Sequence, residues 1–185
     1  FKNLIMYPEW QDRLYAEISE GLRGKEFNYD NINALEHLDN FVWETLRLNP
    51  PVVIQTRDAE EELSFHDGEK KVTIPKGTTM AYLHYFAQRD PKLFEDPFTF
   101  NPDRFQGERG AELKRDMKTF GYYPHDCCGK WLALRGTIKA ALVNMIMKAE
   151  VKAYDLEDVV NMKHVGGVIL KHDRPLNVVF RRRFD

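Results

Sequence analysis

The two cysteines of this chain are adjacent, with a histidine just before them and a glycine just after. Both lie in the stretch FGYYPHDCCGKW, residues 120–131, as Cys127 and Cys128. A disulfide between neighbours would be strained, because their Cα atoms are about 3.8 Å apart and bridged cysteines usually stand about 4.4–6.8 Å apart. A structural zinc ion needs about four ligands, whereas His125 and the two thiols supply three. Taken alone, the pair is interpreted as two reduced thiols, one of them buried.

A deprotonated thiol is also a strong ligand for a soft metal, and the residues around Cys127 suit that chemistry. Gly129 would let the backbone come close to a large planar ligand. A helix that starts there would direct the positive end of its dipole at the sulfur. Phe120, seven residues before Cys127, would shield the sulfur from solvent. This combination is typical of a haem-thiolate site.

Three amphipathic helices are expected to position these residues. The sequence predicts them over 7–22, 33–51 and 130–150, and a polar loop over 23–31 separates the first two. The apolar residues expected to share one face are Leu35, Leu38, Val42 and Leu46 in the second helix, and Leu134, Ile138, Leu142, Met145 and Ile146 in the third. The third helix follows the cysteines directly, so it would set the direction in which they point.

Short strands and irregular connections are expected elsewhere. The segments are a strand at 52–56, a hairpin over 62–75 that turns at Asp67–Gly68, a strand or short helix at 78–88, a proline-rich irregular meander over 89–105, an exposed polar stretch at 107–118, and two or three strands within 151–157 and 166–183. Together these elements predict a mainly α fold with small β-sheets, of the α+β class.

The composition is that of an ordinary soluble domain. The 185 residues are 43% hydrophobic and 30% charged, and the formal net charge of −2 carries no signature of a polyanion partner, so no nucleic acid is expected. No apolar run approaches the roughly 20 residues that span a bilayer. The chain begins at Phe1 without an initiator methionine, so we expect it to be part of a longer protein.

Glu44 and Arg47 stand three residues apart on the second predicted helix, where they can form an ion pair. They point away from the apolar face of that helix. On these residues alone, the pair is interpreted as a solvated surface pair worth a few tenths of a kcal/mol.

Four separated stretches, in order, resemble the C-terminal half of the cytochromes P450. They are ETLR (44–47), QRDPKLFEDPFTFNPDRF (88–105), FGYYPHDCCG (120–129) and, more weakly, GGVILKHDRPLNVVF (166–180). YPEWQDRLYAEI also looks like the helix that precedes the Glu-x-x-Arg helix of the family. The resemblance covers nearly the whole chain. It implies that residues 1–185 are the C-terminal fragment of a single cytochrome P450 domain whose N-terminal part is absent.

The register of the resemblance implies a set of haem contacts. The iron ligand of the family falls at Cys127, and Cys128 takes a variable position as a packing residue, although a one-residue shift of the loop would exchange the two. His125 stands where the family has an arginine for a haem propionate, and Arg57 matches a second such arginine. The implied cofactor-binding residues are Cys127, His125, Arg57, Phe120 and Gly129, with Cys127 bound to the metal.

A buried ion network behind the haem is also implied, and it would be structural rather than catalytic. It joins Glu44 and Arg47 to Arg104 of the meander, and two arginines on one carboxylate need further acceptors such as backbone carbonyls. Two departures from the family pattern stand out. Tyr123 replaces a glycine, whose turn Gly121 is expected to supply instead, and Gln88 replaces a histidine.

Apolar residues on two segments are expected to contact a substrate, with core packing as the alternative interpretation. They are Val52, Val53, Ile54, Val168 and Ile169. No residue is assigned to oxygen activation, because the family places that role before Phe1.

The resemblance implies a haem-thiolate monooxygenase that inserts one oxygen atom from O2 into a small lipophilic organic substrate. Its cofactor is haem b, and its electrons come from NADPH through a reductase or from another electron donor. The alternatives are a haem-thiolate isomerase or dehydratase that acts on peroxides without O2, and a truncated non-catalytic relative. The fragment alone is expected to be inactive. Eukaryotic members carry an N-terminal membrane anchor, which would place a eukaryotic full-length chain inside the cell at the endoplasmic reticulum membrane.

Overall fold

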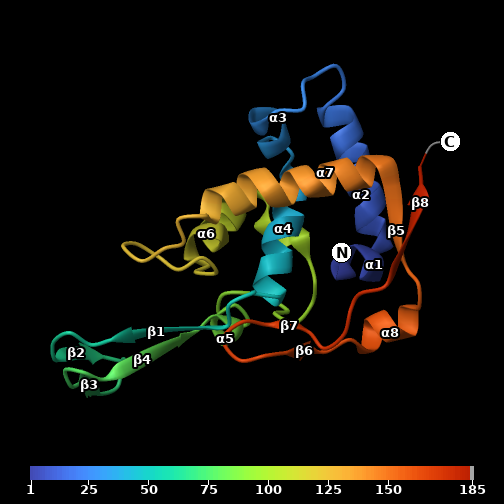
Figure 1. Cartoon of the computed structure of the whole chain (residues 1–185). Coiled ribbons are helices and arrows are strands. Elements are labelled where there is room, and N and C mark those ends of the chain that lie inside the picture. Colours follow the sequence, from blue (N-terminus) through green and yellow to red (C-terminus); the bar gives the residue numbers. More distant parts are fainter. Residues whose placement is uncertain (184–185) are drawn as a thin grey trace.

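Helices form the body of the molecule, and the strands form small two-stranded sheets around it (Figure 1). The structure, a computed structural model, describes residues 1–183. The helices are α1 (Lys2–Met6), α2 (Pro8–Gly21), α3 (Tyr29–Asn33), α4 (Glu36–Leu48), α5 (His84–Ala87), the 3-10 helix η1 (Pro102–Phe105), α6 (Gly107–Asp116), the π-helical turn η2 (Leu132–Thr137), α7 (Ile138–Lys148) and α8 (Leu156–Asn161). The expected class, helices with small β-sheets, is confirmed.

The strands pair only in antiparallel twos within the described residues. The pairs are β1 (Ile54–Asp58) with β4 (Thr79–Leu83), β2 (Leu63–His66) with β3 (Lys71–Ile74), β5 (Ala149–Ala153) with β8 (Val178–Arg182), and β6 (His164–Val165) with β7 (Lys171–His172). The hairpin predicted over 62–75 is confirmed. Residues 78–88, which fitted a strand or a helix, contain one of each, β4 followed by α5.

Several predicted boundaries are wrong because local caps divide the chain more finely than periodicity shows. The side chain of Asn28 accepts a hydrogen bond from the backbone N–H of Asn31 and starts α3 inside the predicted polar loop. Leu35 is extended, so α4 begins only at Glu36. In the tail, Asp155 caps the unpredicted helix α8, and the chain forms four short strands there rather than two or three.

The segment 107–118, predicted as an exposed polar stretch, is largely helical. It forms α6, and Leu113 is buried with a cluster that includes Trp43 and Phe105. Gly110 and Leu113 are the buried residues of α6, and they hold this helix against its neighbours although its other residues are mostly polar.

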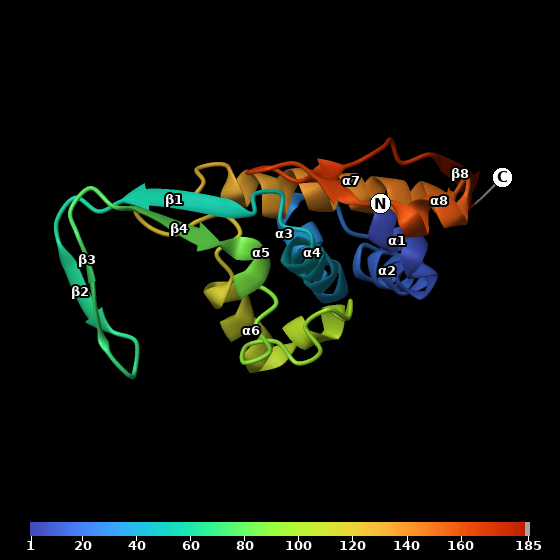
Figure 2. The same ribbon diagram turned by 90° about the horizontal axis from the view of Figure 1, so that it is seen from below.

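The core lies where α2, α4 and α7 pack against one another (Figure 2). Leu14, Leu38 and Ile146, one from each helix, are fully buried there. The predicted apolar faces of α4 and α7 therefore supply the core. Among residues 1–183, no helix has the length and apolar character needed to cross a bilayer.

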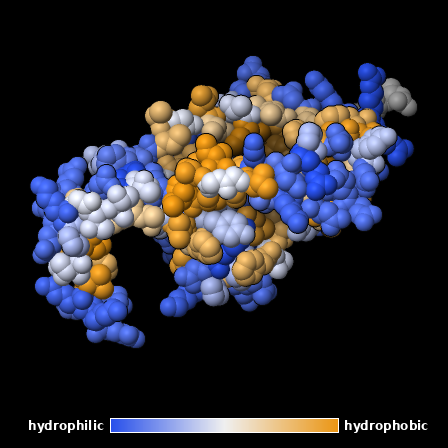
Figure 3. All heavy atoms as spheres, turned by 60° about the horizontal axis from the view of Figure 1, so that its bottom comes forward, coloured by the Kyte–Doolittle hydropathy of each residue, from blue (hydrophilic) through white to orange (hydrophobic). Residues whose placement is uncertain are grey.

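The β1–β4 and β2–β3 pairs extend away from this body (Figure 2). All residues of β2 are exposed, and the extension is mostly hydrophilic, whereas apolar residues gather on the central part of the face shown in Figure 3.

Candidate functional site

The two cysteines lie in an exposed loop, residues 119–129, here called the thiol loop. Gly121 is buried and has a φ of +74°, a conformation that side chains other than glycine rarely adopt. A Cβ at this position would also lie 3.0 Å from the carbonyl oxygen of His125 and 3.2 Å from Nε2 of Gln55 on β1. Gly121 therefore supplies the turn as predicted, and Tyr123 carries no positive φ.

Backbone hydrogen bonds fix the position of Cys127 within the loop. Its N–H donates to the carbonyl of Phe120 (2.8 Å), and its own carbonyl accepts from the N–H of Lys130 (3.1 Å). Helical bonding then begins with Ala133 N–H donating to Gly129 O (2.9 Å). The thiol thus stands directly before a helix, as the sequence predicted.

Both thiols are free and exposed in this structure. The expectations that one of the pair is buried and that Cys128 is a packing residue are therefore wrong. The loop turns back on itself with its side chains outward, so neither sulfur reaches the core. A Cβ added at Gly129 would lie 3.7 Å from the sulfur of Cys127, an ordinary van der Waals contact, so Gly129 and this sulfur are close neighbours.

A buried ion network, here called the Glu44 network, links α4 to the meander. The side chains of Glu44 and Arg47 are 0% exposed, and that of Arg104 is 9% exposed. Arg47 donates from Nε to Oε2 of Glu44 (2.7 Å) and from Nη2 to Oε1 (2.9 Å). Arg104 Nε (3.2 Å) and the backbone N–H of Asn101 (2.8 Å) donate to the same Oε1. The surface-pair interpretation is wrong, and the structure joins the three residues that the resemblance grouped.

The remaining guanidinium donors bind backbone carbonyls of the irregular meander. Arg47 Nη1 donates to the carbonyls of Gln88 (2.9 Å) and Pro97 (2.7 Å). Arg104 Nη1 donates to the carbonyl of Glu95 (2.8 Å), and both arginines reach the carbonyl of Thr99. A segment without regular secondary structure leaves its carbonyls unpaired, and the two arginines satisfy them.

Gln88 connects this network to the thiol loop. It is 2% exposed, its amide lies 2.6 Å from the hydroxyl of Thr119, and Thr119 directly precedes Phe120. With the amide oriented to satisfy both ends, its oxygen accepts from Thr119 while its nitrogen donates to the carbonyls of Leu46 (3.1 Å) and Arg47 (3.0 Å). The sequence marked Gln88 only as a departure from the family. Its position one residue before the proline-rich meander was the one feature of the sequence that could have indicated this connecting role.

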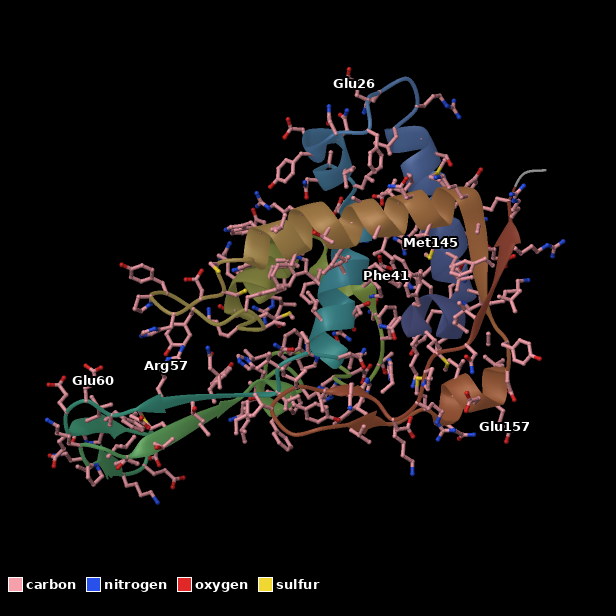
Figure 4. All side chains as sticks on the ribbon, viewed as in Figure 1. Glu26, Phe41, Arg57, Glu60, Met145 and Glu157 are labelled. Carbon is pink, nitrogen blue, oxygen red and sulfur yellow. The ribbon has the colours of Figure 1, made fainter. Side chains whose placement is uncertain are left out.

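The two expected propionate contacts are exposed side chains. His125 lies in the thiol loop, and Arg57 lies on β1, where its Nη1 donates to the neighbouring carbonyl of Thr56 (2.7 Å). Figure 4 shows Arg57 on the side of β1 that faces the thiol loop. Phe120 is half-buried and packs against the cluster that contains Leu134, so much of its ring lies against the core.

The two segments expected to contact a substrate lie side by side. Val52 and Ile169 form an isolated antiparallel bridge, and Val53 N–H donates to the carbonyl of Val168 (3.0 Å). Val168 and Ile169 are 58% and 65% exposed, and Val52, Val53 and Ile54 are half-buried. None of the five is part of the buried core of residues 1–183, so the core alternative is wrong for this chain.

Within the described chain, no three histidine, cysteine, aspartate or glutamate side chains come together in a way that could hold a metal ion. The thiol loop therefore offers sulfur as a single ligand rather than a closed set of protein ligands.

A sequence model described as Cytochrome P450 matches residues 1–180. The chain is 35% identical over 140 residues to cyclooctat-9-en-7-ol 5-monooxygenase of Streptomyces melanosporofaciens, covering 74% of this chain and 29% of that protein. It is 31% identical over 193 residues to the cytochrome P450 monooxygenase ausG of Emericella nidulans, covering 98% and 35%. It is 30% identical over 159 residues to leukotriene-B4 omega-hydroxylase 3 of Mus musculus, covering 84% and 30%. The chain thus spans about a third or less of the length of these curated relatives.

Proposed function

The chain belongs to the cytochrome P450 family, and from this premise we propose that it is the C-terminal, haem-binding part of a monooxygenase. The family implies a haem cofactor, and the relatives named above are monooxygenases and a hydroxylase. The observation that carries the proposal is the Glu44 network, a fully buried carboxylate shared by two arginines and connected through Gln88 to the loop that holds the thiols.

The residues present fit a haem. The thiol of Cys127 is exposed, and its neighbour Gly129 places no side chain beside the sulfur. Arg57 makes no ion pair among the described residues, so its cation is available for a propionate. Haem bound here would supply the chemistry that activates O2 and transfers one oxygen atom to a lipophilic substrate.

The residues described above take the following roles in this proposal. Cys127 would supply a thiolate ligand to the iron, and the hydrogen bond from its N–H to the carbonyl of Phe120 holds this residue in the loop. Arg57 and His125 bind the propionates. The Glu44 network fixes the position of the meander. The hydrogen bond between Gln88 and Thr119 connects this network to the start of the thiol loop. The bridged residues Val52 and Ile169 line the substrate side.

An electron donor protein, such as a reductase that uses NADPH, is the proposed partner. Trp131, two residues after Gly129, is 52% exposed, and both Lys130 and Arg135 stack on its ring, at 5.0 and 4.2 Å from the centroid. A cationic and aromatic surface next to the thiol loop suits an acidic partner. For a eukaryotic full-length protein, we propose attachment to the endoplasmic reticulum membrane through residues that precede Phe1.

The iron ligand is tested in the full-length protein by replacing each sulfur separately. We expect Cys127→Ala to abolish the thiolate signature in the carbon-monoxide spectrum of the ferrous protein, and Cys128→Ala to leave it unchanged. The reverse result would move the ligand to Cys128. An unchanged spectrum in both variants would refute thiolate ligation by this loop.

The reaction is tested by supplying 18O2, NADPH and a reductase with a panel of lipophilic substrates. We expect one labelled oxygen atom in the product. Product from a lipid hydroperoxide in the absence of NADPH, without label from O2, would instead support a peroxide isomerase or dehydratase. A full-length protein that takes up no haem would support the non-catalytic alternative.

A further inference from the structure

Two histidines stack on each other at the base of the β6–β7 hairpin. His164 of β6 and His172 of β7 are direct cross-strand partners, and their ring centroids are 4.9 Å apart with an interplanar angle of 30°. Directly opposed residues of antiparallel strands share one face of the pair, so the two imidazoles contact each other there. The two strands share only one other residue pair, Val165 with Lys171. The histidine stack is therefore half of the ladder that closes this hairpin.

The tip of the same hairpin carries two residues of the proposed substrate side, Val168 and Ile169. Two backbone hydrogen bonds hold the tip to the segment that follows α4. The N–H of Val53 donates to the carbonyl of Val168 (3.0 Å), and the N–H of Leu170 donates to the carbonyl of Pro51 (2.9 Å). Because a ladder this short is weak, loss of the stack at the base would release the bonds at the tip.

Cations surround the histidine stack. Lys2 of α1 lines a cavity of about 100 Å³ together with His164 and His172. Arg89, which follows α5, repels a proton on His164. The α-amino group of Phe1 acts on His172 in the same sense, and it would be a neutral peptide group in a longer chain.

The acidic side chains near the stack are already paired. Oδ1 of Asp173 accepts from the backbone N–H of Lys163 (3.1 Å), and its Oδ2 accepts from Nη2 of Arg174 (3.0 Å). Asp158 of α8 pairs with the same arginine at 2.7 Å. Lys171 adds a further positive charge on β7. A proton on either ring would therefore meet a second imidazole and several cations, with little negative charge to compensate.

We propose that His164 and His172 are positioning residues for the substrate side: stacked and neutral, they hold the hairpin against the segment after α4, and protonation of either ring releases it. The two imidazoles act through Val168 and Ile169. Contact between these two residues and a substrate rests on the function proposed above, whereas control of the hairpin by the histidine stack does not.

The surroundings of the stack set the direction of the pH effect. Partial burial and then the neighbouring cations lower the pKa of both imidazoles from the ordinary value near 6.5. In the open hairpin the rings regain that value, so opening takes up protons. The closed hairpin is fully favoured above about pH 6.5 and loses stability as the pH falls through the lowered pKa values.

The test is amide hydrogen exchange of the full-length protein, expressed as protection factors so that the intrinsic pH dependence of exchange is removed. Between pH 7.5 and pH 5.5 we expect the protection of the Val53 and Leu170 amides to fall about tenfold in the wild type. His164→Phe/His172→Phe keeps two stacked rings that cannot be protonated, so its protection should not depend on pH. Nδ1 of His172 has no hydrogen-bond partner in the described chain, so phenylalanine loses no bond of that atom.

The matched control is His66→Gln, because His66 is an exposed histidine of β2 that lies opposite Lys71 on the β2–β3 pair. His84 is 1% exposed on α5, and burial also lowers its pKa, so His84→Phe is a second control. Both controls should keep the tenfold fall. If the double variant does not fold, His164→Phe and His172→Phe alone should each show a smaller fall than the wild type. No fall in the wild type, or an equal fall in the wild type and all variants of the pair, would overturn the proposal.

The link to the substrate side is measured separately, through the KM of a substrate found in the panel described above. We expect the KM of the wild type to rise several-fold more between pH 7.5 and pH 5.5 than that of His164→Phe/His172→Phe. Equal changes in the two proteins would overturn the role of the pair on the substrate side. A full-length protein that takes up no haem would contradict the proposed function, and hydrogen exchange would still decide whether the histidine stack controls the hairpin.

Discussion

Two clusters of charged residues lie on the same helix, α4, and they differ in the cations that pair with their carboxylates. The Glu44 network lies in its C-terminal half. In its N-terminal half, Asp39 pairs with Lys139 of α7 (2.6 Å) and with Lys114 of α6 (2.7 Å). Lys139 is 2% exposed, whereas Asp39 keeps 26% of its side chain in solvent. Both clusters neutralise buried charge, but only the first uses arginine.

The difference follows from what each cluster must hold. Lys114 and Lys139 join helices whose backbone groups already bond to one another, so compact charges on flexible stems are sufficient. The meander has only scattered turn bonds between its backbone groups, and the fixed donors of Arg47 and Arg104 bind several of its carbonyls at once. We conclude that arginine is required where ion pairing must also shape an irregular backbone.

The largest expected effect is at the Glu44 network. Glu44→Gln leaves Arg47 buried without its counter-charge and should lower the free energy of unfolding by about 3–5 kcal/mol. Arg47→Lys keeps the charge but loses the several N–H donors of the guanidinium. Because the meander carbonyls then lose their partners, we expect proteases to cleave the meander faster. Urea unfolding and limited proteolysis of the full-length protein measure both. A loss below about 1 kcal/mol in either variant would contradict the distinction between the two clusters.

A smaller loss is expected when the carboxylate of the second cluster is removed. Asp39→Asn leaves Lys139 buried with only Asn33 Oδ1 as a partner, at 3.1 Å. Because Asp39 is partly in solvent, which screens its charge, we expect a loss of about 1–3 kcal/mol at neutral pH. A loss as large as that of Glu44→Gln would show that the two clusters do not differ in the way we describe.

The same carboxylate predicts an acid dependence of stability. Burial by itself raises the pKa of Asp39, but the ammonium groups of Lys139 and Lys114 outweigh it and lower the pKa overall. The unfolded state therefore takes up this proton first as the pH falls. The contribution of Asp39 is complete at neutral pH and is lost below about pH 4. Urea midpoints from pH 6 to pH 3 should fall more steeply for the wild type than for Asp39→Asn. Parallel curves would contradict this role.

At Gln88, which joins the Glu44 network to the thiol loop, the expected effect is a coupling energy between two residues, smaller than the losses of stability given above. A double-mutant cycle between Gln88→Leu and Thr119→Val should give a coupling energy of about 0.5–1.5 kcal/mol. Gln88→Leu should also shift the ferrous carbon-monoxide spectrum, whereas Asp39→Asn should leave it unchanged. Absence of coupling, with an unshifted spectrum, would mean that the network does not communicate with the thiols.

The smallest effect is expected at an exposed pair. Arg109 and Glu112 lie one turn apart on α6 with both side chains about half exposed or more. Arg109→Ala should change the free energy of unfolding by about 0.5 kcal/mol or less. The loss of free energy of unfolding in this variant is the reference for the losses at the two buried clusters. A larger loss would show that pairing at the surface contributes more than we assume.

The elements and their core faces were largely readable from the sequence, because apolar residues at steps of three and four mark α2, α4 and α7 directly. The burial of Glu44 and Arg47 was not readable from the helix alone. Their face of α4 is polar, and it is covered by the meander, a segment distant in sequence, so the carbonyls that satisfy Arg47 come from Gln88, Pro97 and Thr99. The resemblance to a family supplied this grouping where periodicity pointed to the surface.

The same limit applies to Gln88 and Cys128. A single glutamine shows no periodicity, and its role depends on Thr119, which lies 31 residues away. Adjacent cysteines were expected to include one buried side chain, yet the loop presents both outward, because its backbone bonds, rather than side-chain packing, determine its path.

The π-helical turn at Leu132–Thr137 has a consequence for the angular position of the sulfur. Such a turn holds one residue more than an α-helical turn, and each residue of an α-helix advances the chain by about 100° around the axis. Removing one residue, for example Gly136, would restore a regular helix. If Ile138–Lys148 kept its packing, the thiol loop would then rotate about the helix axis by roughly that angle. The extra residue therefore acts as an angular spacer, and the direction of the Cys127 thiol depends on the number of residues in this turn as well as on their types.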